Sequence, residues 1–440
     1  MRLLFFLLIF FSSLANNVPN FERAYAQSAL PNKPSTSNAN EAQQVLERAR
    51  PAIVQIKGFF GTNTVPAFHG TGFAVAEKGI SITNYHVVAQ RVHDPDRYHL
   101  EYETVEGKKG KVVVVAVDLR HDLAIVRTIG YEPAPLSIKS EVPSKGSKAF
   151  AIGYPLDVGL TITEGISNGR VADSFNARIH YSGALNGGMS GGPTLNEKGE
   201  VIGVNVSGYV FSQLVSFLVP GDDAVVFRDR VLNEKLKDEK IDVKALQKAA
   251  VAQMKAHSKA LLDRLNGFIS TQVVSGYRLP GKLSKFVNCS ATSKTEPKQP
   301  VEMTLISCSA NAGLLIENGL SSGNLEYSHK ILSSKTLGAW RFAKKLSGRT
   351  LPSGLYGKRK HVGPFACENQ IVGLKGFDAN IMMCVRSHRK LDGLYDFATR
   401  VVSLNGKTQG FVNLTKLYGV EFDSGMKFMR SFVGAMEYVP

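Results

Sequence analysis

The chain has 440 residues, which is too many for one ordinary hydrophobic core, so we expect two or three domains. Its composition, 43% hydrophobic and 20% charged, is typical of a globular protein, and no long apolar run follows the first residues, which excludes a chain built from several membrane-spanning helices. Its formal net charge is +16. The 41 glycines and the few long periodic apolar runs favour β structure.

The positive charge is concentrated in the second half of the chain. Residues 234–440 contain 31 Lys and Arg and 16 Asp and Glu, a net charge of +15. A soluble basic surface is the simplest interpretation. An affinity for anionic partners, such as lipid headgroups or cell-wall polymers, is the alternative. Nucleic acid is not an expected partner of an exported protein.

The start of the chain resembles a secretory signal. Arg2 precedes an apolar stretch at residues 3–11, which has the length of a signal-peptide core and is too short to span a bilayer. Small-residue cleavage patterns follow at residues 13–15 and 24–26, and the second fits better. We expect a signal peptide at residues 1–26 and an exported protein, either periplasmic or extracellular. An uncleaved membrane anchor remains the alternative.

Residues 27–40 are rich in Ser, Asn, Pro and Ala and predict a disordered lead-in, and residues 41–50 predict a short helix that Pro51 ends. Short strands separated by glycine turns are expected from residue 53 onwards, which is typical of a sandwich or barrel. The expected strands lie at residues 53–57, 71–76, 81–83, 111–117, 123–128, 149–152, 169–171, 178–181 and 201–206.

Two helices are expected next, at residues 222–237 and 242–266. In the second, apolar side chains recur every three or four residues, Asp242 can cap the start, and Gly267 can close the end. We expect this helix to pack on a neighbouring domain, and a coiled-coil dimer is the weaker alternative. Its buried face would contain Val243, Leu246, Ala250, Met254, His257, Leu261 and Leu265.

Residues 268–440 return to strand and turn patterns, with expected loops at 279–281 and 405–406 and a final helix near 424–438. All four cysteines lie here, and an even number in an exported protein suggests two disulfides. Three pairings are possible, and the shortest loops favour Cys289 with Cys308 and Cys367 with Cys384. A zinc site is the rival, but the metal-binding spacings are absent from the sequence. No motif here indicates a chemical role.

Three short motifs carry chemistry, at residues 83–88, 120–126 and 186–193. They present His86, Asp122 and Ser190 in that order within one β-rich block. A serine hydroxyl needs a nearby base to act as a nucleophile, and a carboxylate on the other ring nitrogen keeps the histidine in the required tautomer. Glycines around Ser190 allow a sharp turn whose N–H groups can bind a developing oxyanion.

From about residue 53 to 232 the chain resembles the double β-barrel peptidase domain of the HtrA/Deg branch of trypsin-like serine proteases. The resemblance rests on these motifs and on residues 70–73, 122–124, 151–155, 199–205 and 216–220. It implies that His86 is the general base, Asp122 orients it, and Ser190 is the nucleophile. It also implies that the amides of Gly188 and Ser190 form the oxyanion hole. No metal or organic cofactor is implied.

The chain departs from that family at several points. Met189 precedes the nucleophile, where the family usually has Asn or Asp, and Tyr85 replaces the usual small or amide residue before the histidine. No peptide-binding PDZ domain is recognisable after the protease block. The resemblance places Ala184 at the specificity position, with Leu185 and Ser216 beside it. An acidic residue is absent there, so cleavage after uncharged, small or medium apolar residues is expected.

The sequence therefore predicts a mainly β protein with a trypsin-like protease domain at residues 41–233, a helical connector at 234–267 and a disulfide-containing basic domain at 268–440. The expected function is an exported serine endopeptidase that acts on polypeptides through an acyl-enzyme. The alternative is a latent or inactive protease-fold protein that binds through its basic domain. The sequence leaves the oligomeric state open.

Overall fold

The computed structural model describes residues 36–155, 158–208, 214–234, 242–265, 269–294, 300–317, 320–348, 357–404 and 406–439. The chain divides into two compact units, residues 1–40 and 41–440. The expected signal peptide lies outside the described residues. Within the described ranges, no helix is long and apolar enough to cross a membrane.

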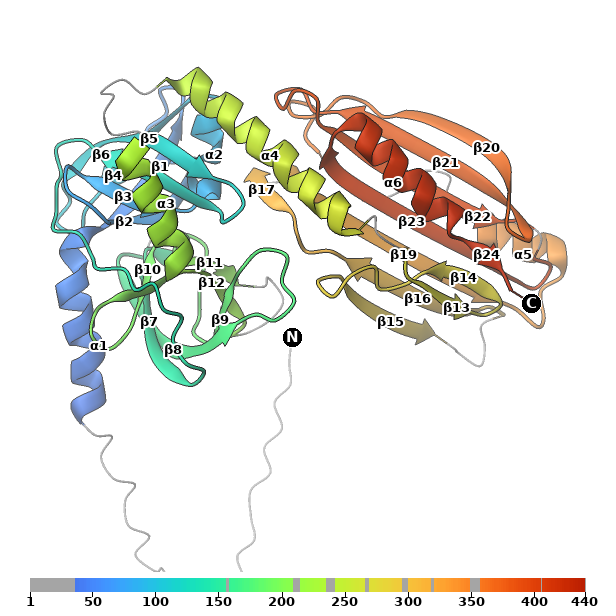
Figure 1. Cartoon of the computed structure of the whole chain (residues 1–440), viewed down its shortest axis with the longest axis horizontal. Helices are drawn as coiled ribbons and strands as arrows, with labels where there is room; N and C mark the ends of the chain where they lie inside the picture. Colours follow the sequence, from blue (N-terminus) through green and yellow to red (C-terminus); the bar gives the residue numbers. More distant parts are fainter. Residues whose placement is uncertain are drawn as a thin grey trace, which may run out of the picture. The chain divides into compact units, whose positions relative to one another are not determined.

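The first six strands form a closed barrel, as the alternation of short strands and turns indicates, and a helix precedes them. Helix α1 (Thr36–Ala49) begins before the expected residue 41, so the expected disordered segment does not extend to residue 40. The order of strands around the first barrel is β1-β2-β3-β6-β5-β4 (Figure 1). The strands are β1 (Ile53–Phe60), β2 (Phe68–Ala74), β3 (Ile80–Thr83), β4 (Tyr98–Glu103), β5 (Lys109–Asp118) and β6 (Leu123–Thr128).

A second closed barrel follows, with the strand order β10-β11-β12-β9-β8-β7. Its strands are β7 (Ser147–Gly153), β8 (Thr161–Arg170), β9 (Ile179–Tyr181), β10 (Pro193–Leu195), β11 (Val201–Gly208) and β12 (Ser216–Pro220). One buried cluster contains Phe73 and Ile82 of the first barrel together with Phe150 and Val204 of the second. Burial of this shared apolar surface therefore fixes the two barrels against each other.

The connector is helical, as predicted. Helix α3 (Gly221–Glu234) precedes it, and helix α4 (Val243–Leu265) is capped by Asp242, whose side chain accepts a hydrogen bond from the Lys244 amide at 2.9 Å. Along α4, Leu246 and Met254 pack in a cluster with the first barrel, whereas Leu261 and Leu265 belong to the core of the following sheet. The helix therefore packs against both neighbours through one face. Gly267 lies outside the described residues.

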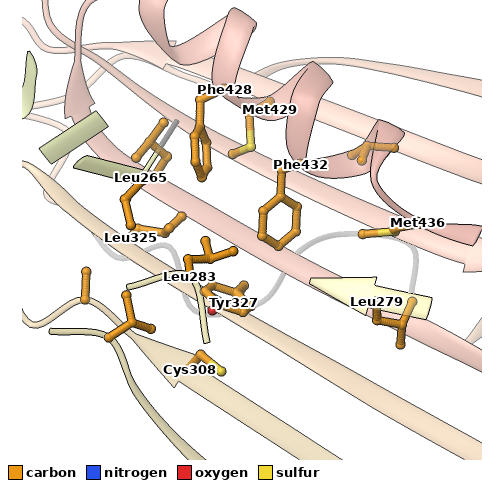
Figure 2. Close-up of a cluster of buried hydrophobic side chains, with 14 of the residues drawn as sticks. Leu265, Leu279, Leu283, Cys308, Leu325, Tyr327, Phe428, Met429, Phe432 and Met436 are labelled. Atoms are coloured by element: carbon orange, nitrogen blue, oxygen red, sulfur yellow. The ribbon is translucent and has the colours of Figure 1, made fainter. Parts of the chain in front are cut away.

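The C-terminal part is built on a seven-stranded antiparallel sheet in the order β15-β16-β19-β23-β22-β21-β20. Helix α6 (Phe422–Gly434) lies across it, and Figure 2 shows Phe428, Met429 and Phe432 of this helix above the sheet residues Leu325 and Tyr327. The sheet strands are β15 (Asn288–Lys294), β16 (Glu302–Ser309), β19 (Asn324–Ser333), β20 (Ala366–Leu374), β21 (Phe377–Ser387), β22 (Tyr395–Ser403) and β23 (Gln409–Val420).

Smaller elements surround this sheet. They are β13 (Thr271–Val274), β14 (Tyr277–Pro280), β17 (Leu314–Glu317), β18 (Leu320–Ser322), α5 (Ala339–Ser347) and β24 (Glu437–Tyr438). Two expectations were wrong here. The segment expected as a loop at 279–281 largely belongs to β14, and the last helix ends at Gly434 because the chain then pairs with β14 as β24. Asn405 lies outside the described residues.

The two disulfides hold the outer hairpins of the sheet, and the predicted pairing is confirmed. Cys289 lies directly opposite Cys308 on β15 and β16, and Cys367 lies opposite Cys384 on β20 and β21. The edge strands β15 and β20 are almost wholly exposed, so apolar burial contributes little to holding them. Each disulfide closes a loop of a length that typically stabilises a fold by about 3 kcal/mol.

Candidate active site

His86 and Asp122 are brought together where the start of a helix meets a turn. Helix α2 (Tyr85–His93), absent from the sequence-based expectations, places His86 in its first turn. Asp122 lies between β5 and β6 with a left-handed φ of 60°, a conformation that Asp tolerates better than most residues. Its carbonyl accepts hydrogen bonds from the Tyr85 amide at 3.1 Å and the Asn84 side chain at 2.9 Å.

The Asp122 carboxylate binds His86 through both of its oxygens. Oδ2 lies 2.8 Å from His86 Nδ1, and Oδ1 accepts the His86 backbone N–H at 3.0 Å. The carboxylate therefore also caps the amino end of α2, where a negative charge is favourable. Because an ionised carboxylate only accepts hydrogen bonds, Nδ1 carries the proton and Nε2 is left as the basic nitrogen.

The pKa of His86 reflects opposing influences. Burial lowers the pKa, but the charge and hydrogen bond of Asp122 outweigh burial, and the result is a raised pKa. The positive charge of Arg178 acts in the opposite direction and lowers it. The neutral imidazole needed for a base is therefore favoured at pH values above its ordinary range.

Ser190 lies at the end of a tight loop that enters β10. Gly188 has a φ of 99° and Gly191 a φ of 85°, and an added Cβ would lie 2.2 Å from the Tyr154 carbonyl and the Thr71 carbonyl, respectively. Both positions therefore require glycine. Met189 is fully buried in the core of the second barrel, so this departure from the family pattern serves packing.

The amides of Gly188 and Ser190 are the expected oxyanion donors. The neighbouring amides are engaged, since Met189 N–H binds Asn186 O at 3.0 Å and Gly191 N–H binds Asn205 O at 2.9 Å. In the described part of the chain, the Gly188 and Ser190 amides donate no hydrogen bond. Two free N–H groups beside a serine are available to a developing negative charge.

The Ser190 hydroxyl donates to the carbonyl of Val206 on β11. The pairing of β11 with β12 shifts register between Asn205 and Ser207, which is a β-bulge that leaves Val206 without a cross-strand partner and its carbonyl available. Among the described residues, Ser190 makes no hydrogen bond to His86. Engagement with His86 therefore requires a rotation of the Ser190 side chain.

Thr71 of β2 joins the first barrel to the nucleophile loop. It is fully buried. Its amide donates to the Ser190 carbonyl at 2.8 Å, and its hydroxyl donates to the Gly188 carbonyl at 2.7 Å and accepts the Tyr154 amide at 3.1 Å. Thr83 in turn donates to the Thr71 carbonyl at 2.7 Å. Thr71 therefore holds the backbone on both sides of Met189.

The residues expected to line a substrate pocket lie on different elements of the second barrel. Ala184 is exposed, and its carbonyl accepts the Thr163 hydroxyl at 3.0 Å. Leu185 packs with Met189 in a buried cluster, and Ser216 is buried where β12 pairs with β9. These three residues remain a prediction for the specificity pocket.

Sequence reasoning missed three contributors to the site. Thr71 belongs to the motif at residues 70–73, but nothing in the sequence indicated its role. No motif or pattern in the sequence pointed to Val206 or Arg178 as parts of the site. Their roles arise from a bulge and from contacts between distant segments, which composition and spacing do not report.

Comparison with known proteins identifies relatives of the part of the chain that forms the two barrels. Residues 70–204 match the trypsin-like peptidase domain. Human serine protease HTRA3 is 30% identical over 254 residues, covering 53% of this chain and 55% of that protein. The probable periplasmic serine endoprotease DegP-like of Chlamydia pneumoniae is 30% identical over 225 residues, covering 48% of this chain and 43% of that protein.

Bovine mitochondrial serine protease HTRA2 is 34% identical over 216 residues, covering 45% of each chain. The solved structure of the serine endoprotease from Yersinia pestis is 24% identical and has a TM-score of 0.38, with 44% of this chain and 67% of that chain covered. The chain spans about half the length of the curated relatives it matches. The match to the family model and the identity to these curated proteases show that the chain contains a trypsin-like peptidase domain related to those of the HtrA and Deg serine proteases.

Proposed function

We propose that the protein is a serine endopeptidase in which Ser190 attacks the peptide carbonyl, His86 transfers the proton and Asp122 orients His86. The observation that carries this proposal is the short His86–Asp122 hydrogen bond beside a serine whose loop presents two unengaged amides. Similarity to HtrA and Deg proteases supports the same chemistry.

In the proposed reaction, His86 Nε2 takes the proton of the Ser190 hydroxyl as its oxygen bonds to the substrate carbonyl carbon. The resulting oxyanion would be bound by the Gly188 and Ser190 amides. His86 then gives the proton to the leaving amine, the peptide bond breaks, and an acyl-enzyme remains. Water, activated by His86, hydrolyses that ester and restores Ser190.

The resting position of the Ser190 hydroxyl favours a second candidate, a latent enzyme. Its hydroxyl is committed to the Val206 carbonyl, so the nucleophile is not yet activated. A peptide N–H entering the cleft would compete for the same carbonyl and release the hydroxyl toward His86. In an inactive protein that only binds polypeptide, the hydrogen bond from the Ser190 hydroxyl to the Val206 carbonyl would persist when polypeptide is bound.

The expected substrate is a polypeptide, cleaved after an uncharged side chain that lies near Ala184, Leu185 and Ser216. Export is part of the proposal, because the two disulfides are the kind of bond that persists in an oxidising compartment. The HtrA and Deg relatives include a probable periplasmic endoprotease, which agrees with this location.

Incubation of the purified protein with reduced, carboxymethylated lactalbumin tests the proposal. We expect discrete fragments with new amino termini, identified by mass spectrometry, from the wild type and none from Ser190→Ala. Fragmentation that persists in Ser190→Ala would exclude Ser190 as the nucleophile. If the wild type leaves the substrate intact, the result would favour a latent or inactive protein over an active endopeptidase.

Thr71→Val is expected to lower kcat by about tenfold to a hundredfold with a smaller change in KM, because the Gly188 carbonyl loses its anchor and the oxyanion amides shift. The variant also leaves two buried backbone groups without a partner, which costs about 1–3 kcal/mol each in stability. Thermal unfolding therefore has to be measured beside the steady-state kinetics.

Thr71→Ser is the matched control, because it keeps the hydroxyl. We expect its kcat to stay within about threefold of the wild type, since the hydrogen bonds to Gly188 and Tyr154 persist. Equal kcat values for Thr71→Val and the wild type would show that the hydroxyl does not position the loop.

A further inference from the structure

A cavity of about 640 Å³ opens beside the nucleophile, between the second barrel and the C-terminal part of the chain. The barrel contributes Val206, Phe217 and the segment that contains Phe175 and Arg178. The C-terminal part contributes Lys282 and Lys285. Val206 is the residue whose carbonyl accepts the Ser190 hydroxyl, so the cavity borders the position where the proposed reaction takes place.

The position of the C-terminal part next to the barrel is supported by packing. Phe175 of the barrel segment is buried in the core of the C-terminal sheet, and its ring meets Phe286 edge-on at 5.1 Å. Arg264 of α4 lies 4.8 Å from the centre of the same ring. Burial of this large aromatic side chain across the boundary stabilises the wall of the cavity.

The residues that line the cavity are mainly basic. Among the described residues, Arg178, Lys282 and Lys285 form no ion pair. Arg178 Nη1 donates to the neighbouring Ala177 carbonyl at 2.9 Å. Asp173 is the one carboxylate that lines the cavity among the described residues. Three positive charges against one negative charge leave an electrostatic field that favours an anionic group.

Arg178 lines the cavity and also interacts electrostatically with the catalytic groups. Burial lowers the pKa of the Arg178 guanidinium, and the negative charges of Asp122 and Asp223 act in the opposite direction. The same guanidinium lowers the pKa of His86. An anion bound in the cavity would therefore lie close enough to Arg178 to be sensed by the His86–Asp122 pair.

We infer that this cavity binds an acidic side chain of the polypeptide substrate, a few residues from the bond that is cleaved. The inference rests on the proposed protease function and adds a substrate preference to it. A chain extends by about 3.3 Å per residue, so a substrate held at Ser190 reaches a cavity bordered by Val206 within a few residues. The C-terminal part would thereby complete the substrate cleft through Lys282 and Lys285.

The test uses the full chain and a library of proteome-derived peptides, with cleavage sites mapped by mass spectrometry. We expect Asp and Glu to be enriched at a position near the cleaved bond. A peptide with Glu at that position should then be cleaved with a kcat/KM up to about fivefold higher than the same peptide with Gln, as expected for exposed ion pairs. Added salt should reduce this preference.

The variant Lys282→Glu/Lys285→Glu should lose or invert the preference for the Glu peptide. Both lysines are exposed, so the fold is expected to tolerate the change. The control Lys330→Glu/Lys335→Glu makes the same charge change at exposed lysines of the C-terminal part that do not line the cavity. It should retain the wild-type preference. Arg178 is left unchanged because its charge also acts on His86.

Cleavage without Asp or Glu enrichment, or an equal preference in the two double variants, would overturn the inference and leave the protease function intact. Failure of the wild type to cleave any peptide would overturn the proposed function and this inference with it. Cleavage of both peptides at equal rates by the wild type would count against the cavity alone.

Discussion

Ser190→Ala is expected to lower kcat for peptide hydrolysis about a millionfold, the scale observed when a serine protease loses its nucleophile. The change removes one hydroxyl and leaves His86, Asp122 and the loop amides in place. Ser190 is almost fully buried, and among the described residues its hydroxyl donates to the Val206 carbonyl alone, so little of the fold depends on it. The Ser190→Ala variant should therefore still bind substrate, although it no longer cleaves it.

Steady-state cleavage of a mapped peptide and thermal unfolding measure the two effects separately. The control is Ser137→Ala, the same substitution at an exposed serine outside the site, which should leave kcat unchanged. A Ser190→Ala protein that retains more than about one hundredth of the wild-type kcat would point to another nucleophile.

Asp122→Asn is expected to lower kcat about ten-thousandfold, because the histidine is then held in the wrong tautomer. The carboxylate accepts from both the His86 backbone amide and Nδ1. An amide side chain has one oxygen for these two donors, and its NH₂ group would face one of them. With the NH₂ group toward Nδ1, the proton moves to Nε2, and the base toward Ser190 is lost.

The same variant changes the pH dependence. Asp122 outweighs burial and raises the pKa of His86, and the base works only when His86 is neutral. The wild-type kcat/KM should therefore rise as the pH increases through this raised pKa. Without the carboxylate the pKa falls, so the residual activity of Asp122→Asn should reach its plateau at a lower pH than the wild type.

Asp118→Asn provides a matched control for that experiment. Asp118 Oδ2 lies 3.0 Å from His121 Nδ1, which gives a second Asp–His pair near the site but without the serine. Its loss should alter stability and leave kcat within about threefold of the wild type. A loss of kcat in Asp118→Asn similar to that in Asp122→Asn would indicate a general structural effect.

The sequence predicted many of the barrel strands because they are short, β-branched and separated by glycine turns. It missed β4 and β10, and the strand expected at 169–171 is only the end of β8, which begins at Thr161. Strand β6 occupies the predicted residues 123–128. Helix α2 was missed because it is only nine residues long and begins at a carboxylate cap supplied by Asp122, which is distant in the sequence. Local propensity cannot register such a cap.

The same limit explains the C-terminal part. Pro280 suggested a turn, yet it is the last residue of β14, the central strand of a small three-stranded sheet, and lies beyond the residues of β14 that pair with β24. The disulfide pairing was predictable because each cysteine pair lies within one hairpin. The packing of the C-terminal part beside the cavity depends on Phe175, which no periodic pattern in the sequence indicated.

The candidate triad was predictable because its three motifs have a recognisable order. The hydroxyl position of Ser190 was not, because it depends on the bulge at Val206. The anchoring role of Thr71 was not either, since it joins two barrels that are far apart in the chain. Tertiary contacts of this kind determine the position of the Ser190 hydroxyl before substrate binds.

Reaction of the purified protein with a fluorophosphonate probe, with the adduct located by mass spectrometry, tests the central claim most directly. Phosphonylation needs an activated serine and no knowledge of the substrate. We expect the wild type to be labelled at Ser190, and Ser190→Ala and His86→Ala to remain unlabelled. A wild type that is not labelled, or is labelled equally in His86→Ala, would contradict a working His86–Asp122–Ser190 triad.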